Sequence, residues 1–482
     1  MNLSKIKKIY LIGIKGVGMT MLAQFLRGQN IEIIGSDTAE KYMTDEVLAK
    51  SGIKVIEEFN EENIPADADL IVYSTAYNAE NNIEVKKALS GKIKTLKYAE
   101  ALGEIFNSHY GIAVCGSHGK TTTTAWLGYI LERAGLRPSV LVGSSVPQFS
   151  GAVLSGASDY FVAELDEYQN KLQYFQPKIV LLNNIDWDHP DFFPTFESYQ
   201  QAFIDFIKKI PKKGFLIANF DDEVIRRTAN VNCHGKVVSY GITNEDVDYF
   251  GYDIKSVDGK VYFKVDLSPR PFSLPAGRQA SQERGDRENL GEFCISLSGR
   301  HNVSNALAVI ATAIELGVSL VDIRTYLEEF IGTARRMQFL GEFKGAKIYD
   351  DYAHHPTEIQ ATLQGARELF GKKKITVVFH PHTFTRTKAY LDDFAKSFND
   401  ADEVIVLDIY GSAREKHGGV SSEELAKAIF NFQFSIFNKK EIKHIPTLDQ
   451  AEKYLRGNLE RGEVVILMGA GDVFRIGEKL LA

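Results

Sequence analysis

Short apolar runs alternate with amphipathic segments along the whole chain. Near the N-terminus, the run "KIYLIGI" is followed by glycines, by an apolar-periodic segment from Met19 to Leu26, and by a second run, "IEIIGSD". This order is typical of a β-α-β unit. Further strands are expected near 69–75 and 92–97. We therefore place a Rossmann-like first domain at about 1–108.

A second alternating series begins at "YGIAVCG". A helix follows, because Leu127, Ile130, Leu131 and Ala134 share one face. The strands "YFVAEL" and "KIVLLNNI" are nearly continuous in apolar residues, which predicts a parallel sheet covered on both faces. This central domain is expected over 109–333.

The segment 267–292 differs from its surroundings, because it is rich in Pro, Gly, Arg and Glu and has no periodicity. We interpret it as a mobile surface loop inserted between two strands of the central domain.

A third series occupies about 334–482. It contains the strands "AKIYDD" and "ITVVF", helices over 357–370 and 387–399, and a helix opened by the capping box Ser421-x-x-Glu424. The chain is therefore predicted to be an α/β protein of three domains: a Rossmann-like N-terminal domain, a central nucleotide-binding domain with a parallel sheet, and a Rossmann-like C-terminal domain.

Composition narrows the functional classes. The 482 residues include 56 basic and 63 acidic side chains, a formal charge of −7, which argues against a nucleic-acid partner. The three cysteines are far apart and indicate a reducing compartment. No run reaches 18 apolar residues, so membrane insertion is not expected and the cytoplasm is the predicted location. A monomer and a homodimer both stay open.

Two glycine-rich turns carry candidate phosphate chemistry. The first, "GIKGVG", contains Gly13, Gly16 and Gly18, and the strand after it ends at Ser36 and Asp37. Glycines at a helix start let a backbone approach a pyrophosphate, and an acid after the second strand often binds ribose. A tight strand-to-helix turn without a ligand would produce the same pattern.

The second turn, "CGSHGKTTTT", lies between an apolar strand and a helix, as a P-loop requires. Its spacing is shorter than G-x-x-x-x-G-K-[ST]. Lys120 would neutralise the β- and γ-phosphates of ATP, and the Thr121 hydroxyl would bind Mg²⁺. The predicted ATP-binding residues of the turn are Gly116, Ser117, His118, Gly119, Lys120, Thr121 and Thr122.

Polar residues follow several other strands. Glu164 and His189 would emerge beside the P-loop at the carboxyl edge of the sheet, where they could bind metal. Asn302 and Asn305 open an apolar helix, so Asn302 either caps that helix or contacts a nucleotide. "DDYAHHP" and "HPHTFTRT" suit a charged substrate, and they lack a regular zinc-ligand spacing.

Together these motifs resemble the Mur ligase family of peptidoglycan synthesis. The resemblance extends over nearly the whole chain through "GIKGVGM", "GSHGKTTTT", "AELDE", "NNIDWDHPD", "GRHNVSNALA", "RRMQFLGE", "DDYAHHPTEI" and "HPHTFTRT". Family members have the short G-x-x-G-K-T loop. The resemblance implies an ATP- and Mg²⁺-dependent ligase that joins the lactyl carboxylate of UDP-N-acetylmuramate to L-alanine through an acyl phosphate.

The resemblance also assigns roles. The metal ligands would be Thr121, Glu164 and His189. Arg336 and Asp351 would join Lys120, Glu164 and His189 in catalysis, and would complete the ATP site with Asn302 and Asn305. The substrates would be held by Gly13, Gly16, Gly18, Ser36, Asp37, Tyr352, His354 and Arg386. Because these residues come from three domains, closure would assemble the site.

Some features leave alternatives open. Thr383 stands where the family often has Arg. The stretches "ELDEYQNKL" and "NNIDWDHPDFF" resemble the recycling members that join UDP-N-acetylmuramate to a preformed tripeptide, but those members typically read "EPRSNT" where this chain reads "HPHTFT". A nicotinamide-dependent oxidoreductase would explain only the first glycine turn. A non-catalytic P-loop switch would not need the third domain's histidines and Arg386.

Overall fold

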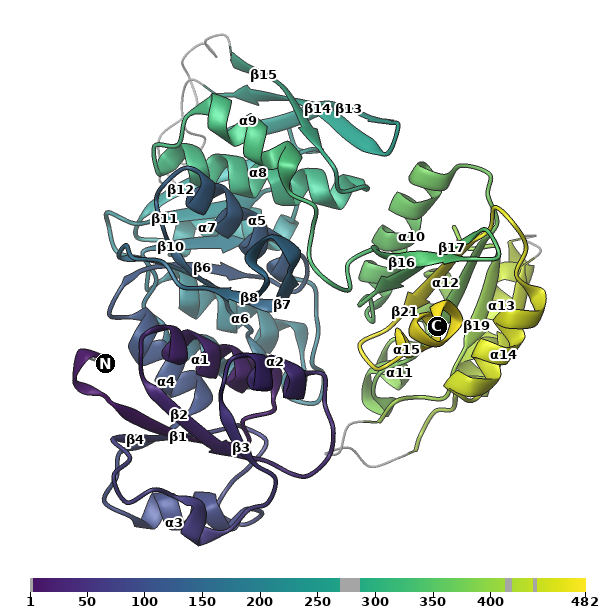
Figure 1. The fold of residues 1–482 in the computed structure, drawn as a ribbon. Coiled ribbons are helices and arrows are strands. Elements are labelled where there is room, and N and C mark those ends of the chain that lie inside the picture. Colours follow the sequence, from purple (N-terminus) through teal and green to yellow (C-terminus); the bar gives the residue numbers. More distant parts are fainter. Residues whose placement is uncertain (1–2, 269–286, 412–417, 437–439) are drawn as a thin grey trace.

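Three β-sheets, each covered by helices, make up the computed structural model, which describes residues 3–268, 287–411, 418–436 and 440–482. Figure 1 shows the N-terminal part (purple) below the central part and the C-terminal part (green to yellow) beside both. Within these residues, no helix combines the length and apolarity needed to cross a membrane. The predicted three-domain α/β fold is confirmed.

The N-terminal sheet is parallel throughout, in the order β3-β2-β1-β4-β5. Its buried strands β1 and β4 read as continuous apolar runs because helices cover both faces. Its elements are β1 Lys8–Ile12, α1 Val17–Gly28, β2 Glu32–Ser36, α2 Thr44–Lys50, β3 Lys54–Ile56, β4 Leu70–Tyr73, α3 Ile83–Ser90, β5 Thr95–Lys97 and α4 Tyr98–Phe106.

The central sheet has ten strands in the order β15-β14-β13-β12-β11-β10-β6-β9-β7-β8. The predicted parallel pairing holds from β7 through β13, while β8 at one end and β14 and β15 at the other are antiparallel. The strands are β6 Tyr110–Cys115, β7 Ser139–Val146, β8 Gly151–Leu154, β9 Tyr160–Glu164, β10 Ile179–Leu182, β11 Phe215–Asn219, β12 Lys236–Gly241, β13 Tyr249–Val257, β14 Lys260–Leu267 and β15 Glu288–Ile295.

The loop predicted over 267–292 is too long at its C-terminal end. Residues 288–292 belong to β15, where Glu292 pairs with Lys264 of β14. Leu290 is buried whereas Glu288, Asn289 and Glu292 are exposed, and these polar residues obscured the strand in the sequence. Residues 269–286, on which the rest of this prediction falls, lie outside the described residues.

Helix α5 runs through the centre of the molecule, directly after the P-loop. Every residue from Thr121 to Leu131 is buried, because α8 and α9 pack on the side away from the sheet. The predicted apolar face therefore understates how much of this helix is covered. The central helices are α5 Lys120–Arg133, α6 Phe196–Ile207, α7 Glu223–Asn232, α8 Arg300–Glu315 and α9 Leu320–Glu329.

The C-terminal sheet has the order β16-β17-β21-β18-β19-β20, parallel except for the β16–β17 pair. The capping box of Ser421 and Glu424 is present at the start of α13. The elements are β16 Gln338–Phe343, β17 Ala346–Asp351, α10 Pro356–Phe370, β18 Ile375–Phe379, α11 Phe384–Ala389, α12 Leu391–Lys396, β19 Glu403–Val406, α13 Ser422–Ser435, β20 Glu441–His444, α14 Leu448–Asn458, β21 Val464–Met468 and α15 Arg475–Leu481.

One predicted helix of this domain was wrong. The segment 387–399 is not continuous: α11 ends at Ala389 and α12 begins at Leu391. The intervening Tyr390 leaves helical geometry (φ −112°, ψ 23°), and its hydroxyl donates to the Trp187 carbonyl of the central domain (2.6 Å). A tertiary contact thus accompanies the break.

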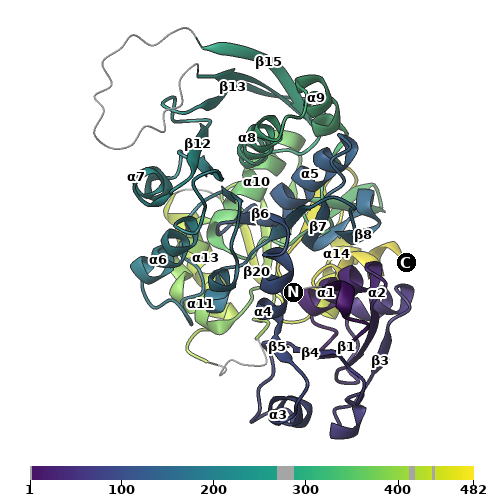
Figure 2. The same ribbon diagram turned by 90° about the vertical axis from the view of Figure 1, so that its left-hand side faces the viewer.

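The N-terminal and central parts share one hydrophobic core. Phe161 of β9 meets Phe25 of α1 edge-to-face at 5.2 Å and Phe106 of α4 at 5.9 Å. Figure 2 shows α1 and α4 beside the central strands. This packing fixes the first glycine turn relative to the P-loop.

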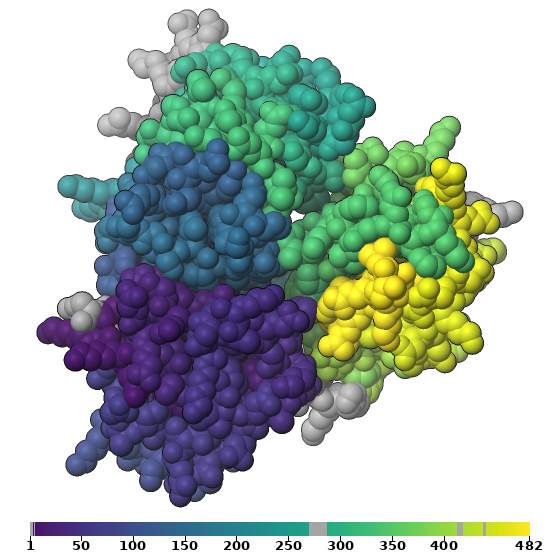
Figure 3. Space-filling view, viewed as in Figure 1, coloured from purple at the N-terminus to yellow at the C-terminus, as the bar shows by residue number. Residues whose placement is uncertain are grey.

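Three successive residues of the central domain hold the C-terminal domain. Asp186 accepts a hydrogen bond from the Thr357 hydroxyl (2.6 Å), the Trp187 carbonyl accepts from Tyr390, and Asp188 is paired with Arg386. Figure 3 shows the C-terminal part lying against the rest of the molecule. The segment after β10 therefore sets where the C-terminal residues stand relative to the P-loop.

Candidate active site

The P-loop is shaped by two glycines in the left-handed region. Gly116 (φ 125°) and Gly119 (φ 78°) adopt backbone conformations that side chains disfavour. A Cβ on Gly119 would stand 2.6 Å from Asn305 Oδ1, and one on Gly116 would stand 2.9 Å from the Asn184 carbonyl oxygen. The short loop is therefore a tight fit between β6, the segment after β10 and α8.

The remaining P-loop residues are anchored on the segment after β10. The Ser117 hydroxyl donates to the Asp186 carbonyl (2.6 Å) and accepts from its N–H (2.8 Å), while the His118 N–H donates to Asn184 Oδ1 (2.7 Å). Thr122 is buried in the first turn of α5. These bonds hold the loop open at the N-terminus of α5, where N–H groups favour anions.

Lys120 lies folded over its own loop. Its Nζ donates to the carbonyls of Gly116 (2.6 Å) and Ser117 (2.9 Å), and it stands 3.6 Å from Glu167. Burial disfavours the charged amine, but Glu167 and neighbouring acids outweigh burial, and the pKa of Lys120 is raised. The side chain is thus a cation held at the mouth of the loop.

Thr121 and Glu164 meet as predicted. The Thr121 hydroxyl donates to Glu164 Oε1 (2.8 Å), and the Gly143 N–H donates to the other carboxylate oxygen (2.7 Å). A hydroxyl and a carboxylate side by side supply oxygen ligands of the kind that Mg²⁺ prefers.

His189 joins a different group of ligands. Its Nε2 lies 3.8 Å from Glu167, and one ligand atom each of Asp166, Glu167 and His189 falls within 4.8 Å of the others. We did not predict Asp166 or Glu167, although both follow β9 in "AELDE". The position of the turn after β9 decided which acids meet His189, and periodicity does not report that.

Asn302 and Asn305 lie inside α8, and the capping interpretation of Asn302 was wrong. The N-cap is Gly299, whereas Asn302 donates from its side chain to the Ser298 carbonyl (2.7 Å). Asn305 Nδ2 donates to Asn302 Oδ1 (3.2 Å), and its own Oδ1 faces Gly119. The pair is therefore placed against the P-loop.

Arg336 and Asp351 come from the C-terminal domain. Asp351 accepts hydrogen bonds from the N–H groups of Met337 (2.8 Å) and Ala353 (2.9 Å), and burial raises its pKa. The Arg336 guanidinium lies over the ring of Tyr352, 5.4 Å from its centre, and 3.8 Å from Glu358. Asp351 thus fixes the backbone that carries Arg336 and Tyr352.

His354 is held between two groups of its own turn. Its Nδ1 lies 3.0 Å from the Tyr352 carbonyl oxygen and 3.2 Å from a Glu358 oxygen. Burial opposes ionisation of Glu358, but His354 and His118 outweigh it and hold the pKa of Glu358 well below its usual range. Glu358, at the start of α10, is another residue that we did not predict.

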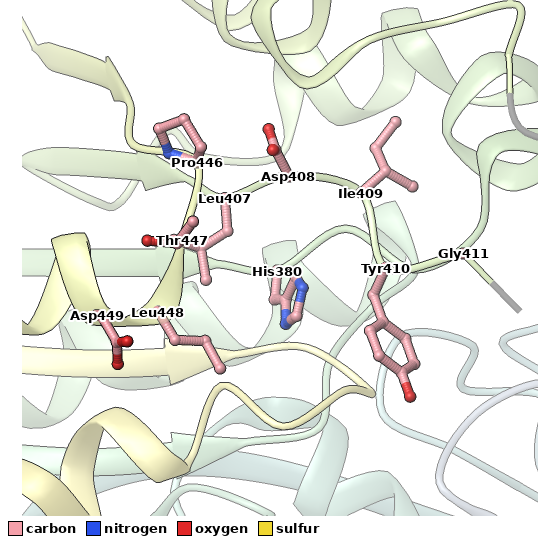
Figure 4. A pocket seen from close by; sticks show the side chains of 10 residues that line it. All are labelled: His380, Leu407, Asp408, Ile409, Tyr410, Gly411, Pro446, Thr447, Leu448 and Asp449. Atoms are coloured by element: carbon pink, nitrogen blue, oxygen red, sulfur yellow. The ribbon is translucent and has the colours of Figure 1, made fainter.

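Arg386 is buried, with hydrogen bonds to Asp188 across the domain interface. Thr383 caps α11 at φ 67°, and its N–H donates to the Tyr410 carbonyl (3.0 Å). A nearby cavity of about 420 Å³ lies at the ends of β18 and β19. Figure 4 shows His380 and Tyr410 among the side chains that line it.

The glycines of the first turn allow two tyrosine rings to pack closely against the backbone. A Cβ on Gly13 would come within 2.7 Å of the Tyr77 ring and one on Gly18 within 2.8 Å of Tyr98, whereas Gly16 has more room. Asp37 accepts from the Lys15 N–H (2.7 Å).

Ser36 is fully buried and donates to Glu84, so its hydroxyl already has a partner inside the domain. The close packing at the end of β2 explains why a small residue, Ser36, stands at this position.

One cleft of about 330 Å³ lies between the first glycine turn and the strand end that carries Glu164. Its wall includes Gly16 and Gly18 on the N-terminal side and Glu164 on the central side. Tyr98 and Lys171 also line it, and Lys171 forms an ion pair with Asp166 (2.5 Å). Lys171 lies in the stretch "ELDEYQNKL" and Tyr98 lies outside the quoted motifs. Neither was predicted as a site residue, and the fold brings both to the cleft.

Comparison with known proteins agrees with this architecture. Family models match three segments: "Mur ligase family, catalytic domain" over 8–110, "Mur ligase middle domain" over 114–313, and "Mur ligase, glutamate ligase domain" over 335–471. The chain belongs to the Mur ligase family.

Individual relatives are similar over nearly their full length. The chain is 37% identical to the UDP-N-acetylmuramate–L-alanine ligase of Desulfitobacterium hafniense, covering 98% of this chain and 99% of the relative. It is 38% identical to that of Alkaliphilus metalliredigens, covering 100% and 98%. The crystal structure of UDP-N-acetylmuramate–alanine ligase from Thermotoga maritima aligns with a TM-score of 0.78 at 25% identity, covering 98% of both chains.

Proposed function

We propose that this protein is an ATP-dependent ligase that joins the lactyl carboxylate of UDP-N-acetylmuramate to the amine of L-alanine. The observation that carries the proposal is the single cleft that runs from Gly16 and Gly18 to Glu164. A sugar nucleotide whose diphosphate lies at the glycine turn would extend its carboxylate toward the P-loop.

The chemistry explains why a phosphate site adjoins that cleft. A carboxylate and an amine do not condense at neutral pH, so the carboxylate oxygen attacks the γ-phosphorus of ATP, the bond to the β-phosphate oxygen breaks, and ADP leaves. The amine then attacks the acyl carbon, and inorganic phosphate departs with the electron pair of the C–O bond. Lys120 would offset negative charge on the transferring phosphoryl group.

Two donor sets fit Mg²⁺. Thr121 with Glu164, and Asp166 and Glu167 with His189, offer mainly oxygen ligands at the mouth of the P-loop. Bound Mg²⁺ would neutralise phosphate charge. The protein's own contribution is to hold these groups on rigid strand ends, so that little reorganisation is needed.

The second substrate would approach from the C-terminal domain. His354, Tyr352 and Arg386 stand on the turn after β17 and on α11, facing the segment that carries Asp188. We infer that they orient L-alanine and the muramyl group. Thr383 contributes no charge here, so Arg386 would be the cation of this segment.

The recycling reaction with a tripeptide is the second candidate, favoured by the sequences "ELDEYQNKL" and "NNIDWDHPDFF". UDP-N-acetylmuramate–L-alanine ligases from several bacteria are 37–38% identical to this chain over nearly its full length, which supports the first candidate.

Phosphate release from ATP tests the proposal. The assay would contain UDP-N-acetylmuramate and either L-alanine, another amino acid or the tripeptide. Release that needs both the sugar nucleotide and L-alanine is expected. Equal turnover without an amine would refute ligation, and a preference for the tripeptide would move the protein to the recycling reaction.

A further inference from the structure

Three potential metal ligands from two domains meet beside the P-loop. One ligand atom each of His118, Asp186 and His355 lies within 4.8 Å of the other two. His118 Nε2 is 3.0 Å from Asp186 Oδ2, and His355 Nδ1 is 3.7 Å from the same oxygen. Ligands of a tetrahedral Zn²⁺ lie about 3.3 Å apart, because each bond is about 2.0–2.1 Å long. The distances from Asp186 Oδ2 to the two imidazole nitrogens, 3.0 and 3.7 Å, lie just below and just above this ligand spacing.

The surroundings orient both imidazoles. Glu358 Oε1 lies 3.3 Å from His118 Nδ1, which leaves Nε2 facing Asp186. A carboxylate on the far nitrogen is the usual partner of a metal-bound histidine, because it fixes the ring and the tautomer. Glu358 would therefore support a metal ion on His118.

His355 is buried and poorly hydrogen-bonded. It is 3% exposed, and its Nε2 has no hydrogen-bond partner among the described residues. Its Nδ1 accepts only a long bond from the Thr357 N–H (3.4 Å). Nδ1 is the nitrogen that faces Asp186, and its weak hydrogen bond leaves it with capacity for a ligand.

This cluster differs in chemistry from the one around His189. It offers two imidazole nitrogens and one carboxylate, whereas His189 is accompanied by two carboxylates. Imidazole suits Zn²⁺, Co²⁺ and Ni²⁺ better than Mg²⁺, which prefers oxygen. The two clusters should therefore select different ions.

We propose that His118, Asp186 and His355 bind a divalent transition metal such as Zn²⁺, which bridges the P-loop to the start of α10. His118 and Asp186 belong to the central domain, and His355 is the N-cap of α10 in the C-terminal domain. The ion would hold the two domains together. If the proposed ligase must separate the central and C-terminal domains during turnover, which rests on the proposed function, the metal would also inhibit the enzyme.

Co²⁺ binding tests the site without reference to ligase activity. Co²⁺ replaces Zn²⁺ and gives intense visible absorption when four-coordinate. Titration of the full-length protein in millimolar Mg²⁺ should develop these bands with one equivalent. The variants His118→Gln, Asp186→Asn and His355→Gln should each lower the affinity at least ~10-fold. Unchanged far-UV circular dichroism would establish that each variant is folded.

Two control variants sharpen the test. His444 also pairs with a carboxylate, Asp408, at 2.8 Å, so His444→Gln should keep the Co²⁺ bands. His189→Gln should keep them too, since that residue belongs to the other cluster. The proposal would be overturned if the unsubstituted protein gave no Co²⁺ bands. It would also be overturned if Asp186→Asn and His355→Gln kept the bands, or if His189→Gln lost them.

Discussion

Arg386 and Asp188 form a buried ion pair that joins the C-terminal domain to the central domain. The Arg386 Nε and Nη2 groups both donate to Asp188 Oδ1, at 3.2 and 2.8 Å. Burial opposes ionisation of Asp188, but Arg386 and nearby histidines outweigh it and hold its pKa well below the usual range. Any ligand of Arg386 must therefore share the guanidinium with Asp188 or displace it.

Removing one partner of this pair should destabilise the docked arrangement. Asp188→Ala leaves the Arg386 charge buried without its counterion, a change that costs about 3 kcal/mol or more. Calorimetry should show the C-terminal domain melting several degrees lower. Glu46→Gln removes one partner of an exposed pair with Lys50 (3.4 Å) and should change the melting temperature little. Equal effects of the two variants would contradict the role assigned to Asp188.

Gly119→Ala should abolish nucleotide binding. The added Cβ would combine left-handed backbone strain with a 2.6 Å contact to Asn305 Oδ1. Gly135→Ala is a matched control, because its φ of 82° brings similar strain while no described atom lies within 4 Å of the new Cβ. We expect ATP affinity, measured by calorimetric titration, to fall more than ~10-fold only in the first variant, since ~1.4 kcal/mol of lost binding suffices. A similar loss of ATP affinity in both variants would mean that backbone strain alone causes it, and not the contact with Asn305.

Lys120→Met should eliminate turnover. The γ-phosphoryl group would lose the cation that offsets its charge, and losses of ~10³-fold in kcat are typical for such a group. Phosphate release measures the effect. Lys178, which is exposed in the same domain, provides the control Lys178→Met, expected to retain normal rates. Near-normal activity of Lys120→Met would place the phosphate site elsewhere.

Asp350 should give the protein a distinct pH dependence. Burial raises its pKa to about 6, despite an ion pair with Arg335 (3.1 Å). The folded state therefore binds this proton more tightly than the unfolded chain. The contribution of Asp350 to the free energy of unfolding is therefore fully present below pH ~4. It is lost as the pH rises through about 6, and the loss amounts to up to ~3 kcal/mol.

The variant Asp350→Asn isolates this contribution, because it cannot ionise. The difference in melting temperature between the unsubstituted protein and Asp350→Asn should shift in favour of the variant between pH 4 and 7. A difference that is independent of pH would show that Asp350 titrates normally in the folded protein.

Site residues that belong to local motifs were predicted from the sequence, whereas site residues placed by long-range contacts were not. Lys120 and Thr121 were found because they follow the glycines of the loop between β6 and α5. Glu164 was found because it ends the apolar strand β9, and the carboxyl ends of parallel strands lie at one edge of the sheet. Asp166, Glu167, Lys171 and Glu358 were not found. Their positions depend on the turn after β9 and on the docking of α10, which no local periodicity records.

The sequence alone determined the three α/β units and the placement of glycines at both strand-to-helix turns, because periodicity and backbone freedom act over a few residues. The tertiary structure decided that His189 faces Asp166 and Glu167, that Arg386 is paired with Asp188, and that His118 meets His355. Each of these contacts joins segments far apart in the chain. The second and third contacts depend on how the C-terminal domain docks, through contacts such as the hydrogen bond from Tyr390 to the Trp187 carbonyl, whereas the first depends on the turn after β9 within the central domain.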